Sequence, residues 1–292
     1  MPAFLVILAG VSWGLLGVFL RQLAAAGFST LDICALRVTG AALILGLGLL
    51  FWKPRLLRIR FRDLWCFIGG GCVSVLFFNY CFFLTLQRTS IGVAVTLLYT
   101  SPIFVSILSW LFFHEAFTRQ KCLAILMMLV GCALVSGMAD GHPVLTPVGL
   151  LTGLASGLCY GLYSIFGRYA QLRGYTTATI TFWNFICATL ASCPFPRWGH
   201  LVHTFAQYPM LWVWAAALVG IATVLPYCSY TSGLARMEAS RAAVLVAIEP
   251  VVGAISGIIF YHECLSVTTI CGCALVLGAM LVQNIASSVS TI

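Results

Sequence analysis

The chain has 292 residues, of which 62% are hydrophobic and 8% are charged, and its net charge is +8. A soluble globular domain carries about 25% charged residues, so this chain has too few to cover a water-exposed surface. The composition excludes a soluble enzyme, a disordered chain and a secreted disulfide scaffold. It leaves a polytopic membrane protein with almost no extramembrane domain.

Ten apolar segments are candidates for membrane-spanning helices, because about 20 apolar residues cross a hydrocarbon layer of ~30 Å. The first begins without a basic region and exceeds a signal-peptide core, so we expect a retained span rather than a cleaved signal. Backbone groups in lipid must be satisfied internally, which predicts an all-α membrane protein. The segments cover residues 3–24, 31–52, 64–86, 91–113, 121–138, 147–170, 177–196, 209–235, 241–261 and 266–286.

The 15 basic residues are distributed unequally over the two sides of this predicted topology. One side holds Lys53, Arg55, Arg58, Arg60, Arg62, Arg119, Lys121, Arg168, Arg173, Arg236 and Arg241, and the other holds Arg21, Arg37, Arg88 and Arg197. Cytoplasmic loops carry the excess of Lys and Arg. We therefore expect both termini in the cytoplasm and the protein in the cytoplasmic (inner) membrane of a bacterium.

The two halves of the chain contain related segments. Residues 10–21 and 157–168 are identical at five of twelve positions, and residues 101–115 and 249–263 at five of fifteen. The shifts, 147 and 148 residues, are nearly equal, which predicts two repeats, 1–140 and 146–286, of five helices each. An odd number of helices inverts the second repeat, an arrangement typical of secondary transporters that bind substrate near mid-membrane.

Several blocks resemble the EamA-type transporter family, the ten-helix branch of the drug/metabolite transporter superfamily. They are TSPIFVSILSWLFFHE (100–115) and IEPVVGAISGIIFYHE (248–263), with LDICALRVTGAALIL (31–45) and ARMEASRAAVLVAIEP (235–250). The resemblance implies export or exchange of amino acids or related small metabolites, with a cavity made mainly by helices 1, 3, 4, 6, 8 and 9. The first helix lacks the acidic residue that carries protons in four-helix multidrug relatives.

These observations favour a secondary transporter, either an exporter or an exchanger, that works by alternating access. Its expected partners are a small-molecule substrate and membrane lipid, without nucleic acid; monomer and homodimer both remain open. We expect no cofactor, metal or catalytic residue. Neither His114–Glu115 nor His262–Glu263 completes an HExxH motif, and the cysteines form no CxxC pair. The alternatives are an integral-membrane enzyme acting on lipid or lipid-linked substrates, and a channel.

Glu249 is the first candidate substrate-binding residue, because a charge inside the membrane is costly to insert. It lies eight residues into its predicted span, beside Pro250. Two interpretations remain open. Glu249 binds a substrate amine or takes up a proton, or it serves as a partner for backbone groups that Pro250 leaves without a hydrogen bond.

Arg37 is the second charged candidate, since a guanidinium can bind a carboxylate through two parallel hydrogen bonds. It lies six residues into the second predicted span, and the alternative is a structural role as a partner of Asp32 or as a side chain that reaches toward the interface.

Aromatic and amide side chains inside the spans are candidates for the cavity wall. A transport cavity needs apolar surface with a few hydrogen-bonding groups, although Trp and Tyr also gather at membrane interfaces. The candidates are Trp13, Asn79, Tyr99, Tyr160, Tyr163, Asn184 and Tyr227.

Small residues and prolines suggest mechanical features. Gly10, Gly14 and Gly17 share one helix face, and so do Gly153, Gly157 and Gly161. Such faces allow close helix packing, which is either static or a surface on which the two halves rock. Pro102 and Pro250 each remove a helical hydrogen bond and are candidate kinks or hinges.

Overall fold

The computed structural model describes residues 2–138, 145–262 and 266–289, which form helices and contain no strand. Seven helical spans are long and apolar enough to cross a membrane: Pro2–Ala25, Thr30–Trp52, Phe61–Arg88, Ile91–Phe113, Pro147–Leu172, Met210–Leu234 and Ala239–Tyr261. The three other predicted segments coincide with the shorter helices α8 (Arg119–Val135) and α10 (Thr177–Ser192) and with α16 (Val267–Val289).

Two of the seven spans, α3 (Thr30–Trp52) and α9 (Pro147–Leu172), are single helices, whereas the other five are interrupted. These consist of α1 (Pro2–Gly14) and α2 (Leu16–Ala25); η2 (Phe61–Asp63), α4 (Leu64–Ile68), η3 (Gly69–Phe77) and α5 (Phe78–Arg88); α6 (Ile91–Leu98) and α7 (Ser101–Phe113); α12 (Met210–Val219), η4 (Gly220–Val224) and α13 (Leu225–Leu234); and α14 (Ala239–Leu245), η5 (Val246–Ile248) and α15 (Glu249–Tyr261). A short 3₁₀ helix, η1 (Pro54–Leu57), follows α3.

The interruptions have local causes. Pro102 and Pro250 occupy the second position of α7 and α15, where the missing N–H leaves no helical hydrogen bond unmade. Two other breaks are π-helical segments, η3 and η4. In each, a hydroxyl donates to the carbonyl oxygen five residues earlier, from Ser74 to Gly69 at 3.0 Å and from Thr223 to Leu218 at 2.9 Å. The helices α7 and α15 also match in length, and each ends at a histidine with a left-handed backbone, His114 or His262.

One helix lies outside the predicted segments. The amphipathic helix α11 (Trp198–Gln207) occupies the stretch that we expected to connect the seventh and eighth spans. It folds because Leu201 and Phe205, one turn apart, face the protein and are buried, and the Phe205 ring packs against Phe28 and Trp212. Ten residues are too few to cross a membrane.

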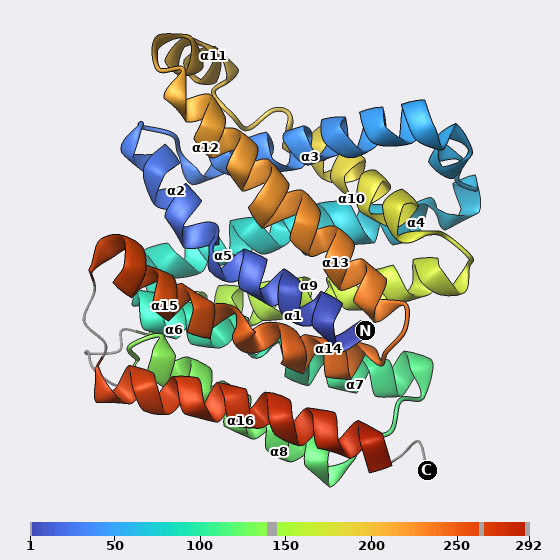
Figure 1. Cartoon of the computed structure of the whole chain (residues 1–292), viewed down its shortest axis with the longest axis vertical. Helices are drawn as coiled ribbons and strands as arrows, with labels where there is room; N and C mark the ends of the chain where they lie inside the picture. Colours follow the sequence, from blue (N-terminus) through green and yellow to red (C-terminus); the bar gives the residue numbers. More distant parts are fainter. Residues whose placement is uncertain (1, 139–144, 263–265, 290–292) are drawn as a thin grey trace.

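The spans pack into two groups of three. We call α4–α7 with η3 and α9 the first helix group, and α1, α2 and α12–α15 with η4 and η5 the second helix group; each combines neighbouring spans from one half of the sequence with one span from the other half. The pairs α3·α10 and α8·α16 pack outside these groups, and Figure 1 shows α8 and α16 side by side along one edge.

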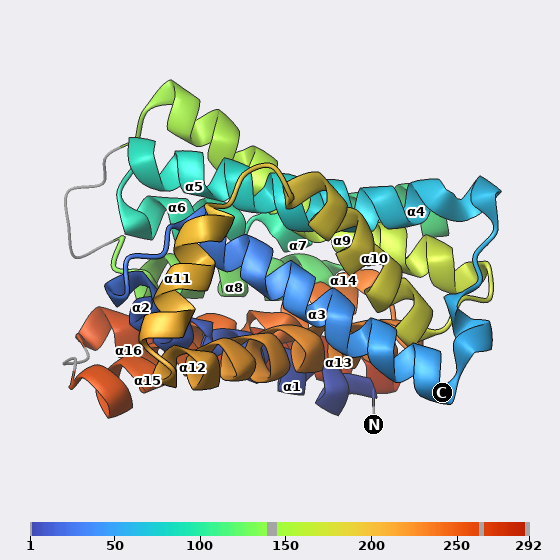
Figure 2. The same ribbon diagram turned by 90° about the horizontal axis from the view of Figure 1, so that it is seen from above.

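The beginning of α1 and the end of α16 lie at the same end of the bundle (Figures 1 and 2), which we call the terminal end. Because successive spans alternate in direction, the loops that follow α3, α7, α9 and α13 are also there. These loops and the helix ends beside them carry the basic residues that we assigned to the cytoplasmic side. The opposite, distal end holds α11 and the ends of α2 and α5.

The predicted glycine faces lie inside the two groups rather than between them. A Cβ atom at Gly10 would lie 2.7 Å from the Val246 carbonyl oxygen, and one at Gly157 would lie 2.8 Å from that of Leu97. These contacts seat α1 on the interrupted span Ala239–Tyr261 and α9 on the interrupted span Ile91–Phe113. The glycines therefore support the static packing interpretation, apart from Gly17, which has nothing within 4 Å.

The α8·α16 pair gives a direct stability test. A Cβ atom at Gly131 would lie 2.8 Å from the Gly272 carbonyl oxygen, so Gly131→Ala should reduce the free energy of unfolding by about 1–3 kcal/mol through overpacking. Gly48 in α3 has nothing within 4 Å, so Gly48→Ala is the matched control and should leave stability equal or slightly higher. Thermal unfolding of the detergent-solubilised proteins measures both, and equal melting temperatures would contradict the close approach.

Candidate functional site

A cavity of about 340 Å³ lies between the two helix groups. Seven of the nine residues that the sequence proposed for substrate binding line it: Trp13, Arg37, Asn79, Tyr99, Tyr160, Tyr227 and Glu249. The cavity begins at mid-bundle and extends to the distal end, where its wall includes Leu20, Leu86 and the exposed Thr30. Its lining is mostly apolar, with a small number of polar groups at fixed positions, as is usual in small-molecule sites.

Glu249 lies at the inner part of the cavity because it is the first residue of α15, where the span restarts after η5. The Tyr160 hydroxyl donates to Glu249 Oε2 at 3.4 Å, and Tyr99 directs its hydroxyl to the same carboxyl group. Tyr99 and Tyr160 belong to the first helix group, whereas Glu249 belongs to the second. The carboxyl group is therefore held between the groups.

Arg37 projects into the same cavity from α3. Its Nε donates to the Thr223 hydroxyl in η4 at 3.2 Å, which orients the guanidinium. Arg37 does not pair with Asp32, which was one of the interpretations left open by the sequence. Asp32 instead caps α3 through Ser29 and accepts from Arg197 Nη2 at 2.9 Å.

The cavity wall therefore contains one basic side chain, Arg37, and one acidic side chain, Glu249. Within a mostly apolar lining, each is costly to bury alone. A ligand that presents a cationic group to Glu249 and an anionic group to Arg37 would satisfy both.

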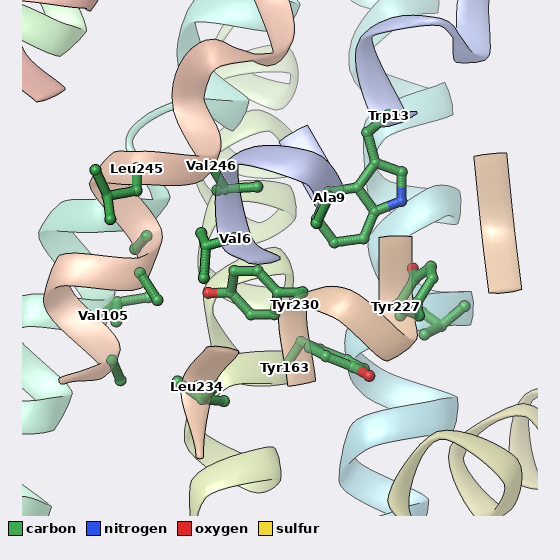
Figure 3. Packing of buried hydrophobic residues seen from close by; sticks show 14 of the residues in the cluster. Val6, Ala9, Trp13, Val105, Tyr163, Tyr227, Tyr230, Leu234, Leu245 and Val246 are labelled. Carbon is green, nitrogen blue, oxygen red and sulfur yellow. The ribbon is translucent and has the colours of Figure 1, made fainter. Parts of the chain in front are cut away.

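Trp13 and Tyr227 line the inner end of the cavity, and Tyr163 and Tyr230 lie behind them; Figure 3 shows these four rings gathered in one cluster. The Trp13 ring meets Tyr227 edge-on at a centroid distance of 5.1 Å, and Tyr227 meets Tyr163 in the same way at 5.1 Å. Edge-to-face pairs at this distance are the favoured arrangement for aromatic rings. These rings come from α1, α9 and α13, so the floor of the cavity is shared by both helix groups.

Two predicted residues lie beside the cavity rather than in its wall. The Tyr163 hydroxyl is hydrogen-bonded to Thr231 at 2.9 Å, on the terminal side of the aromatic floor. Asn184 is buried in α10 against η3, where Cβ atoms at Gly70 and Gly71 would lie within 2.5 Å of it. The sequence GGG at 69–71 is the signal for this approach of α10 to η3.

Sequence reasoning missed an apolar wall on α5. Phe78, Phe82 and Leu86 recur every fourth residue, and Phe83 lines the cavity beside them. The Phe78 and Phe82 rings stack at 6.2 Å, and Phe78 also contacts Tyr160 at 5.4 Å. The spacing of four residues marks one helix face, but in an apolar span this face looks the same as a lipid-facing one.

Of the pairs His114–Glu115 and His262–Glu263, the structure describes both residues only in the first. Glu115 is hydrogen-bonded to the backbone at the start of α14, with 2.8 Å from its Oε1 to the Ala239 nitrogen. Its predicted repeat partner Glu263 lies outside the described residues, as do residues 139–144 around the predicted boundary between the repeats.

Known proteins with similar sequences are named transporters or exporters. A relative from Archaeoglobus fulgidus, named an uncharacterized transporter, is 27% identical over 279 residues, which cover 95% of this chain and 94% of the relative. Threonine/homoserine exporter RhtA of Escherichia coli strain K12 is 28% identical over 267 residues, which cover 88% of this chain and 81% of the exporter.

A solved crystal structure has the same fold, with a TM-score of 0.79 over 98% of this chain and 96% of the other, at 19% sequence identity. The sequence model of the EamA-like transporter family matches residues 1–137 and 147–285. Because this family accounts for both halves of the sequence, and the structure supplies apolar spans around a central cavity, the chain belongs to the EamA-like transporter family and is a multi-pass membrane transporter.

Proposed function

We propose that this protein is a secondary transporter that carries small zwitterionic metabolites such as amino acids across the cytoplasmic membrane by alternating access. The observation that carries the proposal is a cavity with one acidic and one basic side chain, placed between two helix groups and extending to one end of the bundle. A site reached from one side at a time is what alternating access requires.

In this proposal the amine of the substrate binds Glu249 and its carboxylate binds Arg37, while Phe78 and Phe82 contact the apolar part. The separate partners that hold the two charged side chains, Tyr160 and Thr223, support fixed positions for both. The name of the threonine/homoserine exporter, a relative at 28% identity, supports the amino-acid class.

We further propose ten membrane-spanning segments in two inverted five-helix repeats. The matched prolines and left-handed histidines that bound α7 and α15, together with η3 and η4 in corresponding spans, support two related halves. The two ranges matched by the family model support the same division. The basic loops at the terminal end favour a cytoplasmic terminal end, so the cavity would face outward in this conformation.

The alternative of a membrane enzyme acting on lipid receives less support, because the named relatives are transporters and an exporter. A channel is disfavoured by the aromatic floor formed by Trp13, Tyr163 and Tyr227, which ends the cavity at mid-bundle.

Transport by the purified protein in liposomes tests the proposal. A screen for concentration-dependent increases in melting temperature first identifies binding amino acids. We then expect saturable uptake of the labelled ligand that is accelerated by unlabelled ligand inside the liposomes, because a carrier returns faster when loaded. Linear, non-saturating flux would indicate a pore, and no flux of any bound amino acid would contradict the proposal.

Glu249→Gln should reduce transport about tenfold or more, because the substrate amine loses a charge-assisted hydrogen bond in an apolar site. Initial rates in liposomes, normalised to the amount of reconstituted protein, measure the loss. Asp63→Asn is the matched control, since Asp63 pairs with Arg173 and Tyr175 at the terminal end, away from the cavity. Full transport by Glu249→Gln at every pH tested would remove Glu249 from the site.

Arg37→Ala should remove the preference for an amino acid over the amine that lacks its carboxylate, because only the amino acid pairs with the guanidinium. Competition by the two compounds against labelled substrate gives this ratio. Thr223→Val should raise KM for the amino acid with a smaller change for the amine, since it removes the hydrogen bond that orients Arg37. An unchanged ratio in Arg37→Ala would assign Arg37 to structure alone.

A further inference from the structure

Polar contacts between the two helix groups gather in the terminal half of the bundle. Tyr230 and Thr231 of α13 are hydrogen-bonded to α9 through Ser164 at 2.7 Å and Tyr163 at 2.9 Å. Two turns further along α9 toward the terminal end, Gln171 Nε2 donates to the Thr231 carbonyl oxygen at 2.7 Å. In the distal half, the cavity separates the same two groups. On the distal side of the aromatic floor the two helix groups are therefore separated by the cavity, whereas on the terminal side they are joined by hydrogen bonds.

A small space of about 20 Å³ continues the cavity on the joined side. It shares Trp13, Tyr160 and Tyr227 with the cavity, and hydroxyls line its far side, from Ser74, Ser101, Ser164 and Tyr230. This volume holds about one water molecule, so a metabolite cannot pass in this conformation. Hydroxyls buried at a helix-group interface are suited to a polar substrate that passes when the groups separate.

Glu115 joins the two helix groups at the terminal end of their interface, where α7 meets α14. The left-handed backbone of His114 ends α7 and turns the chain toward α14. The Glu115 carboxylate accepts hydrogen bonds from the backbone nitrogens of Ala239 at 2.8 Å and Ser240 at 3.2 Å, and from the Ser240 hydroxyl at 2.6 Å. A carboxylate at the first N–H groups of a helix is stabilised by their partial positive charge.

An ion pair lies next to this contact. Lys121 Nζ of α8 is 2.7 Å from Glu238 Oε2, the residue that precedes α14. The start of the span Ala239–Tyr261 is therefore held by two carboxylate contacts, one made by Glu115 and one made by Glu238. Of these two contacts, the one between Glu115 and Ser240 joins the first helix group to the second, whereas Lys121 belongs to α8, outside both groups.

We infer that the terminal half of the transport path runs along the seam between α7 and α9 on one side and α13 and α14 on the other, and that Glu115 is the gate residue that holds it closed. This inference rests on the proposed function. Glu115 is partly exposed, so water can replace its hydrogen bonds when α14 moves away. Release of Glu115 separates the groups at the hydroxyl-lined space and connects the cavity to the terminal end.

Accessibility of thiols to a membrane-impermeant maleimide tests the gate without any substrate. Ser164→Cys places a reporter thiol on the seam, and the native Cys34 lines the cavity. The exposed native thiols Cys122, near the terminal end, and Cys193, near the distal end, calibrate which side the reagent reaches. Oriented membrane vesicles present one end at a time, and peptide mass spectrometry gives the labelling rate of each cysteine.

We compare the thiol introduced by Ser164→Cys with and without the additional substitution Glu115→Gln. With Glu115→Gln, this thiol should react from the terminal side roughly tenfold or more faster, because the charge-assisted hydrogen bonds that favour the closed form are lost. Cys34 should react more slowly from the distal side as the open-distal population falls. Ser240→Ala, which removes one of the three donors to Glu115, should give a smaller change in the same direction.

Asp63→Asn is the matched control, because it neutralises another hydrogen-bonded carboxylate at the terminal end. The partners of Asp63, Arg173 and Tyr175, follow α9, so these contacts stay within the first helix group and do not join it to the second. Asp63→Asn should leave both reporter rates unchanged. The gate assignment is overturned if Glu115→Gln leaves both rates unchanged, or if Cys132, buried beside α16, also gains reactivity, which would mean general loosening. A working gate in a protein that carries no amino acid would instead contradict the proposed function.

Discussion

The constraint on which this structure depends is the need of every backbone N–H and C=O group for a partner where water is scarce. An unsatisfied group in the membrane interior costs several kcal/mol, so helices are expected to run unbroken across it. Here five spans are interrupted, and the interruptions surround one cavity. The wall residues Trp13, Tyr99 and Glu249 lie at or beside such breaks, and Thr223 lies inside η4. Irregular backbone lies where it faces the cavity or is buried in protein, as η3 is at Gly70 and Gly71.

Side chains compensate for the hydrogen bonds that the breaks disturb. The hydroxyls of Ser74 and Thr223 accompany the π-helical segments, and Asn79 donates to the Val75 carbonyl oxygen at 2.6 Å just after η3. Thr223 and Asn79 also line the cavity. The same residues thus serve the local backbone and the cavity wall, and Thr223 links the two further because it holds Arg37. A change at Thr223 would therefore affect both the shape of its span and the position of the guanidinium.

The sequence was sufficient to predict the seven long apolar spans and the charged, amide, Trp and Tyr residues of the cavity wall, because both follow from the cost of placing polar groups in hydrocarbon. A charge such as Glu249 inside a span needs a polar surrounding, which a central cavity provides. Hydropathy carries no information about π-helical segments, since they change hydrogen bonding without changing composition. An amide inside a span predicts a wall residue, whereas Asn184 lies outside the cavity wall, buried in α10 against η3, where Gly70 and Gly71 leave room for it. Phe78 and Phe82 were missed because phenylalanine is equally suited to lipid.

The π-helical segment η3 changes the direction in which the side chains after it point. Each residue of an α-helix turns the chain by about 100°, and a π-helix, with i→i+5 bonds, turns it less per residue. The face that α4 presents is therefore out of phase with the face that α5 presents. A single helical wheel drawn through residues 61–88 would merge the cavity face of Phe78 and Phe82 with positions that point elsewhere. In this span, losing or gaining one residue would reorient the entire wall that follows, so insertions and deletions should be more disruptive than substitutions.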